Sequence, residues 1–138
     1  MMVSKGSGYK EQSHTADWAL HVWAVNLPAL FVEAARGMNN LSGAQPTQSP
    51  RVQRRFSTEA ADNESLLVLF LSELVFVAEQ ENLVFNEFDL EIQDSKLNVL
   101  MSGAPILSIS KYIKAVTYNN IQIQKTGAGF QVDIVFDV

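Results

Sequence analysis

Cysteine is absent from the 138-residue sequence, and histidine occurs only twice. Without cysteine the chain can form neither a disulfide framework nor a thiolate zinc site, and it has no cysteine nucleophile. This composition is compatible with the cytoplasm, where we expect the protein to be located. Residues 1–8 contain no apolar segment of the kind that a secretory signal requires, and we expect them to form a flexible tail.

Long hydrophobic runs are also missing. The longest, at residues 66–78, is interrupted by Ser72 and Glu73 and is shorter than the roughly 20 residues that a membrane-spanning helix needs. We therefore expect a helix buried in the core of the protein and no contact with a membrane.

Positive charge is scarce, because 10 lysines and arginines oppose 15 acidic residues and leave a formal net charge of −5. Such a surface does not attract nucleic acid as a whole, so we expect no direct nucleic-acid contact and any RNA role to run through a partner protein. The sequence also lacks a glycine-rich phosphate loop, a G-x-S-x-G elbow and an H-E-x-x-H motif, which are the signatures of three common enzyme classes.

The first half of the chain predicts two strands and two helices. Residues 9–12 and 18–25 are expected to be strands, the second because its residues alternate between apolar and polar. Asn26 is a suitable N-cap and Pro28 falls in the first turn, which predicts a helix over residues 27–39. The apolar stripe of this helix consists of Leu27, Leu30, Phe31, Ala34 and Met38.

A loop at residues 42–50 and a strand at residues 51–58 precede the second expected helix, at residues 63–80. This helix is apolar nearly all round, which predicts a position between other layers with Leu69 and Phe70 in the core.

The second half predicts antiparallel strands. They are expected over residues 87–93, 97–101, 116–125 and 130–137. Turns are expected at residues 94–96 and 126–129, and residues 106–113 follow no regular pattern. The predicted fold class is α+β, with two helices packed on a mostly antiparallel β-sheet in one compact domain over residues 9–138.

Candidate ligand oxygens occur near both ends of the chain. Asp17 is placed where a strand begins, and the sequence ends in Asp137 and Val138, which together offer a side-chain and a terminal carboxylate. Anionic oxygens gathered in one place suit calcium or magnesium, so these three residues form a candidate cation site if the last strand lies beside Asp17. His14 could orient Asp17 or cap the turn by hydrogen bonding. His21 lies on the alternating strand and is expected to be a surface residue of the sheet.

Five short segments follow one another in a fixed order and spacing, and their combination is far more specific than any one of them. They are His14-Thr15-Ala16-Asp17, LFVEAARGM at residues 30–38, ENLVF at residues 81–85, IKAVTY at residues 113–118, and Phe136-Asp137-Val138. From about residue 8 onward the chain thereby resembles the archease family.

This resemblance implies a small α+β protein that is not itself an enzyme but activates the GTP-dependent tRNA-splicing RNA ligase. Archeases promote guanylylation of the active-site histidine of that ligase, restore its multiple turnover and broaden its nucleotide use. The resemblance also implies a divalent cation, most often calcium, held by Asp17, Asp137 and Val138. Lys114 is implied as a contact with the partner or its nucleotide, and His14 and Asn119 are further candidates for partner contact.

The chain departs from the family pattern at two positions. Asn119 stands where the family usually has histidine, so a role that needs a titrating imidazole would be lost there while a hydrogen-bonding role could survive. Trp18 follows the tetrad where the family usually has an aliphatic residue, which changes the packing beside the expected cation.

Two other functions are compatible with the sequence. One is a chaperone-like binding module that modulates other RNA-modifying enzymes, such as methyltransferases. The other is a metal-dependent hydrolase built on Asp17 and Asp137, which the sequence disfavours because no general-base histidine accompanies the two carboxylates.

Overall fold

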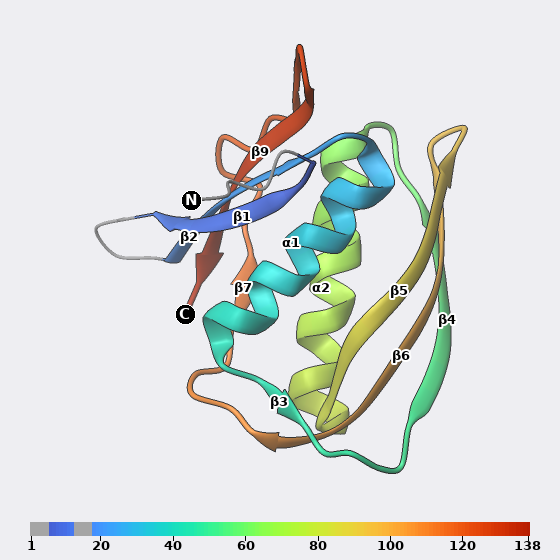
Figure 1. Ribbon diagram of the computed structural model, residues 1–138, viewed down its shortest axis with the longest axis vertical. Helices are drawn as coiled ribbons and strands as arrows, with labels where there is room; N and C mark the ends of the chain where they lie inside the picture. Colours follow the sequence, from blue (N-terminus) through green and yellow to red (C-terminus); the bar gives the residue numbers. More distant parts are fainter. Residues whose placement is uncertain (1–5, 13–17) are drawn as a thin grey trace.

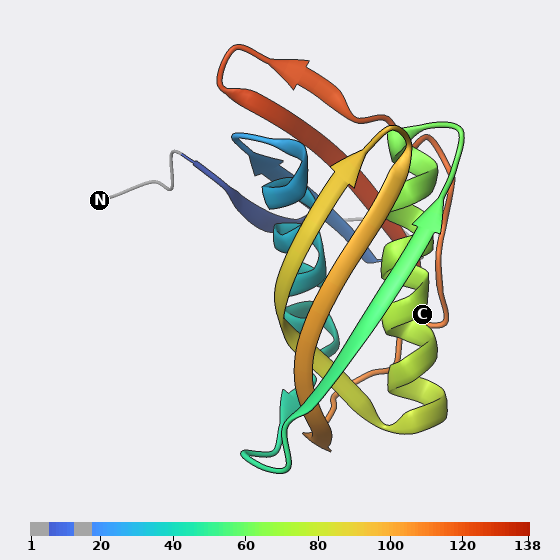
Figure 2. The same ribbon diagram turned by 90° about the vertical axis from the view of Figure 1, so that its right-hand side faces the viewer.

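The computed structural model describes residues 6–12 and 18–138, in which two helices lie between two antiparallel sheets (Figures 1 and 2). The elements are β1 (Gly8–Gln12), β2 (Trp18–Ala24), α1 (Leu27–Ser42), β3 (Gln45–Pro46), β4 (Val52–Glu59), α2 (Asn63–Glu81), β5 (Leu83–Gln93), β6 (Lys96–Ser108), β7 (Ala115–Val116), β8 (Gln124–Thr126) and β9 (Gly129–Asp137). The predicted α+β class is confirmed, and the strands are divided between two sheets rather than gathered in one. No helix within the described residues is long and apolar enough to cross a membrane.

The first sheet joins the beginning and the end of the chain. Its order is β1-β2-β9-β7, and β8 pairs with β9 as the first strand of a hairpin. In the second sheet β6 is central, because β3, β4 and β5 all pair with it. The two helices fill the space between the sheets, so each sheet has one buried face and one face in water (Figure 2).

Helix α1 begins and ends at the residues that its capping chemistry favours. The Asn26 side chain accepts a hydrogen bond from the Ala29 N–H at 2.9 Å, and Gly43 ends the helix in the left-handed conformation with φ 72°. The predicted apolar stripe does face the core, with Leu27 partly buried and its other members buried. The helix runs on to Ser42, past the predicted end at residue 39.

Helix α2 is less enclosed than its apolar sequence predicts. Phe70 is fully buried and stacks on Phe31 of α1 with ring centroids 6.1 Å apart, as expected of a core residue. However, Leu69 is 36% exposed and Phe76 is 56% exposed. The placement of Leu69 in the core was wrong, because one face of α2 is covered by neither sheet.

Strand β6 continues to Ser108, past the predicted end at residue 101 and through Gly103 and Pro105. Pro105 pairs with Leu83 and Gly103 with Phe85, on the other side of a bulge in β5. A Cβ atom at Gly103 would lie 2.1 Å from the Val84 carbonyl oxygen, so only glycine permits this approach of the two strands.

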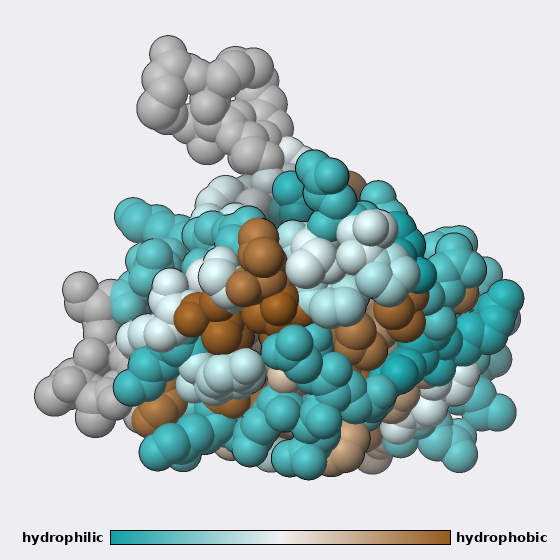
Figure 3. Space-filling model, turned by 90° about the horizontal axis from the view of Figure 1, so that it is seen from below, coloured by the Kyte–Doolittle hydropathy of each residue, from teal (hydrophilic) through white to brown (hydrophobic). Residues whose placement is uncertain are grey.

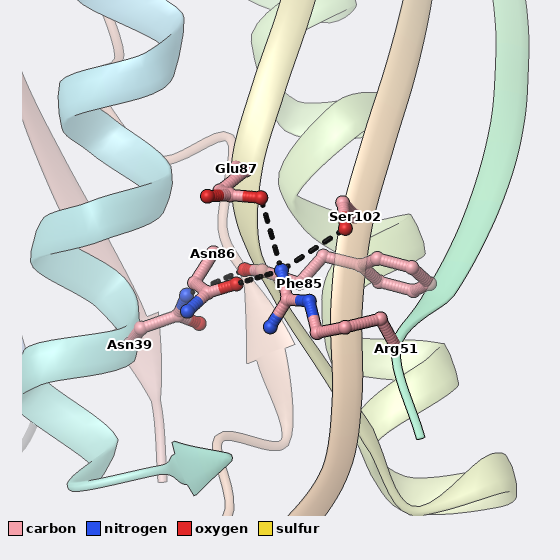
Figure 4. Close-up of polar contacts among 6 residues, drawn as sticks. All are labelled: Asn39, Arg51, Phe85, Asn86, Glu87 and Ser102. Atoms are coloured by element: carbon pink, nitrogen blue, oxygen red, sulfur yellow. Dashed lines mark hydrogen bonds and ion pairs between the residues drawn. The ribbon is translucent and has the colours of Figure 1, made fainter. Parts of the chain in front are cut away.

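The bulge in β5 is held by polar side chains from α1, from β6 and from Arg51, which directly precedes β4 (Figure 4). One guanidinium nitrogen of Arg51, Nη2, donates to Asn86 Oδ1, Glu87 Oε1 and Ser102 Oγ at 3.0–3.1 Å. On the other side, the Asn39 amide of α1 donates to the Phe85 carbonyl at 2.9 Å. The bulge is thereby tied to both its own sheet and the helix layer.

The strand predicted over residues 116–125 is wrong. β7 ends at Val116 and β8 begins at Gln124, and between them the chain turns, with the Ile121 N–H donating to the Tyr118 carbonyl at 3.3 Å. Asn120 adopts φ 54°, a left-handed conformation that asparagine tolerates better than most residues.

Candidate functional site

In the first sheet β9 lies between β2 and β7. The ends of these strands at Trp18, Phe136 and Val116, where the cation was expected, are called the edge below. Phe136 is central to this edge, because it pairs with Trp18 of β2 on one side and Val116 of β7 on the other. Its side chain is fully buried, which fixes the end of β9 against the core.

Asp137 is the next residue of β9 and combines a fixed backbone with a free side chain. It pairs with Ala115, and its carbonyl accepts a hydrogen bond from the Lys114 N–H at 2.8 Å. The Asp137 side chain is exposed, whereas Val138 is partly buried against the core. The Asp137 carboxylate is therefore presented to solvent from a backbone position that is fixed by pairing.

His14 and Asp17 lie outside the described residues. The first described residue after Asp17 is Trp18, which pairs with Phe136. Phe136 in turn directly precedes Asp137. Over residues 6–12 and 18–138, no three histidine, aspartate or glutamate side chains gather into a metal-binding group. The three-residue cation site thus stays a prediction, with Asp137 and Val138 as its described members.

Lys114 lies at the same edge and lines a surface hollow of about 230 Å³ between α2 and β7. The hollow is lined by Ser72, Val75, Phe76, Glu79, Lys114, Ala115 and Val116. Lys114 and Phe76 are both exposed, so this hollow presents a cation and an aromatic ring to solvent next to Asp137. Of these two side chains, the aromatic ring is the type that is enriched at protein interfaces.

Asn119 lies farther along the chain, in the exposed turn after β7. Before this turn, the Thr117 N–H donates to the Val135 carbonyl at 3.0 Å. The chain therefore contacts β9 at a position before Asp137 and farther from the end of that strand. The described contacts therefore connect Lys114, rather than Asn119, directly to Asp137.

Charged groups also cluster on the far side of α2. Arg54 of β4 makes two hydrogen bonds of 2.8 Å to Glu81, which lower the pKa of the Glu81 carboxyl and raise that of the Arg54 guanidinium. Partial burial raises the pKa of the Glu73 carboxyl, although Arg54 opposes this effect. This cluster joins helix and sheet and contains none of the residues predicted for a site.

One polar pair in the first sheet could not be predicted from local sequence patterns. His21 Nδ1 lies 2.7 Å from Asp133 Oδ1, across the directly paired positions of β2 and β9. Strand alternation placed His21 on the outer face correctly, but its partner follows only from the register between strands that are distant in sequence.

The chain is similar to known proteins over nearly its whole length. The model of the Archease protein family (MTH1598/TM1083) matches residues 9–138. "Protein archease" of Methanosarcina mazei is 32% identical over 146 residues, covering 99% of this chain and 100% of that protein. "Protein archease" of Methanopyrus kandleri is 28% identical over 138 residues, covering 94% of this chain and 99% of that protein.

Two solved structures have a similar fold. The solution structure of Methanobacterium thermoautotrophicum protein 1598 has a TM-score of 0.69 at 19% identity, covering 98% of this chain and 100% of that one. The crystal structure of an archease from Thermotoga maritima, described as a possible chaperone, has a TM-score of 0.70 at 18% identity, covering 94% of this chain and 96% of that one.

Proposed function

The chain belongs to the archease family, and we propose that it activates a GTP-dependent tRNA-splicing RNA ligase without being an enzyme itself. In this role it promotes guanylylation of the ligase's active-site histidine and so restores multiple turnover. Family membership supports the proposal, and the lack of common catalytic signatures in the sequence agrees with it.

A divalent cation, calcium by preference, is part of the same proposal. Its ligands are the carboxylates of Asp17 and Asp137 with the terminal carboxylate of Val138. The observation that carries this proposal is the pairing of Trp18 with Phe136, because each predicted aspartate is bonded to one member of that pair. Carboxylate oxygens are the donors that calcium prefers, and the exposed Asp137 side chain can supply them.

The residues next to this edge are proposed to face the ligase. Lys114 offers a compact positive charge that can meet an acidic group of the partner or a phosphate of its nucleotide. Phe76, on the other wall of the hollow, offers an aromatic ring for burial in the complex.

A second candidate function is a chaperone-like module for other RNA-modifying enzymes such as methyltransferases. It is favoured by apolar side chains gathered on the lower face of the molecule, which Figure 3 shows in brown. At this end, where β6 finishes, Leu107 is 70% exposed and Tyr112 is 42% exposed. Exposed apolar patches commonly mark protein-binding surfaces.

Ligation assays distinguish the two candidates. RNA ligation with GTP is followed at sub-stoichiometric ligase, with and without this protein. The activator function predicts multiple turnovers only when the protein is present, together with faster guanylylation of the ligase. A ligase that turns over equally well without the protein would leave the chaperone-like function as the better account.

A further inference from the structure

A polar hollow lies on the outer face of the first sheet, separate from the edge that contains Asp137. Its volume is about 180 Å³, and it lies open to solvent between strands β2 and β9 and the segment at residues 120–124. It is lined by His21, Asn120, Gln122, Gln124, Gln131, Val132 and Asp133.

The wall of the hollow is formed by alternation in residues 120–124. Ile121 and Ile123 pack against the core, so Asn120, Gln122 and Gln124 face the opposite way, into the hollow. The Glu64 carboxylate at the start of α2 accepts a hydrogen bond from the Ile123 N–H at 2.8 Å. Two apolar anchors and one backbone hydrogen bond thus hold this segment in place beside the sheet.

The floor of the hollow is formed by the sheet itself. His21 and Asp133 are directly paired across β2 and β9, and the Asp133 carboxylate can only accept, so the His21 Nδ1–H donates to Oδ1. Asp133 Oδ2 is left to accept from a ligand. The Gln131 amide donates to Gln124 Oε1 at 3.1 Å, which joins the floor to the wall at one end.

The lining fits a neutral ring with hydrogen-bond donors. None of its seven residues is a lysine or arginine, and Asp133 is negative, so a phosphate or carboxylate ligand is disfavoured. Carboxamides offer both donors and acceptors, which match the edge of a nucleobase. The His21 ring, whose centroid lies 5.7 Å from that of Trp23, adds an aromatic surface for stacking.

We propose that this hollow binds a nucleobase that carries an amino group. Carboxylates accept hydrogen bonds from the amino group of cytosine, and Asp133 Oδ2 is the acceptor here. The carboxamides of Gln122 and Asn120 then read the remaining donors and acceptors of the base. The site is distinct from the proposed cation and ligase contacts, and the inference does not depend on them.

Cytidine and uridine provide a matched pair of ligands, because they differ at the amino group of the base. Each is titrated into the isolated isotope-labelled protein, and backbone amide signals are followed by NMR. Cytidine is expected to shift the signals of residues 120–124 and 131–133 in a saturable manner, with uridine binding about tenfold more weakly. Ribose, the sugar that both share, is expected to shift none of these signals.

Two variants test the assignment of the site, and a third serves as control. Asp133→Asn and Gln122→Ala are each expected to weaken cytidine binding about tenfold. Asp89→Asn, the same change at an exposed position on the outer face of the second sheet, is expected to leave it unchanged. The amide spectrum of each variant shows whether it is folded. The proposal is overturned if cytidine shifts none of these signals up to its solubility limit, if uridine or ribose binds equally well, or if folded Asp133→Asn retains full affinity.

Discussion

Trp18 and Phe136 are paired across adjacent antiparallel strands, although they come from opposite ends of the chain. Trp18 follows Asp17 in the sequence and Phe136 precedes Asp137, so this pair connects the two aspartates predicted to share a cation. Val116 pairs with Phe136 from the other side, which brings the segment that contains Lys114 to the same edge.

The first prediction concerns calcium. Asp137→Asn keeps the shape of the side chain but removes one negative charge, so calcium affinity should fall by at least about tenfold. Asp89→Asn on the second sheet is the matched control and should leave the affinity unchanged. Isothermal titration calorimetry measures both. Equal calcium binding by Asp137→Asn and the unmodified protein would exclude Asp137 as a ligand.

The second prediction separates two neighbours in α2. Phe70 is fully buried, so Phe70→Ala should lower the free energy of unfolding by about 3–5 kcal/mol. Leu69 is 36% exposed, so Leu69→Ala should cost about 1 kcal/mol or less. Denaturant unfolding of the two variants provides the comparison. Similar losses for both would mean that α2 is covered on the face that contains Leu69.

The contrast between these neighbours shows what the sequence could predict. Local patterns predicted β2, the Asn26 cap, the stripe of α1 and the hairpin at residues 126–129, because each depends on residues close in sequence. The burial of Leu69 depends on which face of α2 the sheets cover, and an apolar helix carries no pattern that tells its faces apart. Likewise, Gly103 and Pro105 interrupt a local strand pattern, yet the partner strand β5 accommodates them in β6.

For the site, residue chemistry predicted Asp17, Asp137 and Val138 as oxygen donors, and the family resemblance added Lys114. The pairing of Trp18 with Phe136 could not be derived from local patterns, because register between distant strands is set by the whole sheet. The polar hollow was missed for a second reason. The apolar residues of the segment at residues 116–125 are Val116 and Tyr118 and then Ile121 and Ile123, so its alternation shifts by one residue at Asn119-Asn120. This shift marks the turn that creates the wall, and no glycine or proline accompanies it.

The third prediction concerns pH. Hydrogen bonds from Arg54 lower the pKa of Glu81 in the folded protein. The pair therefore stabilises the fold fully above the ordinary glutamate pKa of 4.5, and this contribution is lost as the pH falls through the lowered folded-state value. Glu81→Gln should reduce the loss of thermal stability on acidification in this range, measured by thermal melts at several pH values. Glu79→Gln, exposed on the same helix, is the control and should not change it. An unaltered pH dependence in Glu81→Gln would contradict the assigned role of the pair.

The fourth prediction assigns Lys114 to the partner rather than to the cation. Lys114→Ala should reduce activation of the ligase while calcium affinity stays the same, because the ammonium group meets the partner as a point charge. Lys111→Ala removes another exposed lysine from the same segment and should have little effect. Ligation and calorimetry are measured on each variant. Full activation by Lys114→Ala would exclude Lys114 as a partner contact.

The central claim, that the carboxylates at this edge hold the cation needed for activation, is tested most directly with Asp17→Ala in multiple-turnover ligation at sub-stoichiometric ligase. Asp89→Ala is run in parallel as the control, and thermal melts confirm that both variants are folded. We expect Asp17→Ala to leave the ligase at a single turnover while Asp89→Ala restores the full rate. Full turnover with folded Asp17→Ala would contradict the account and would mean that the activating surface does not depend on the cation.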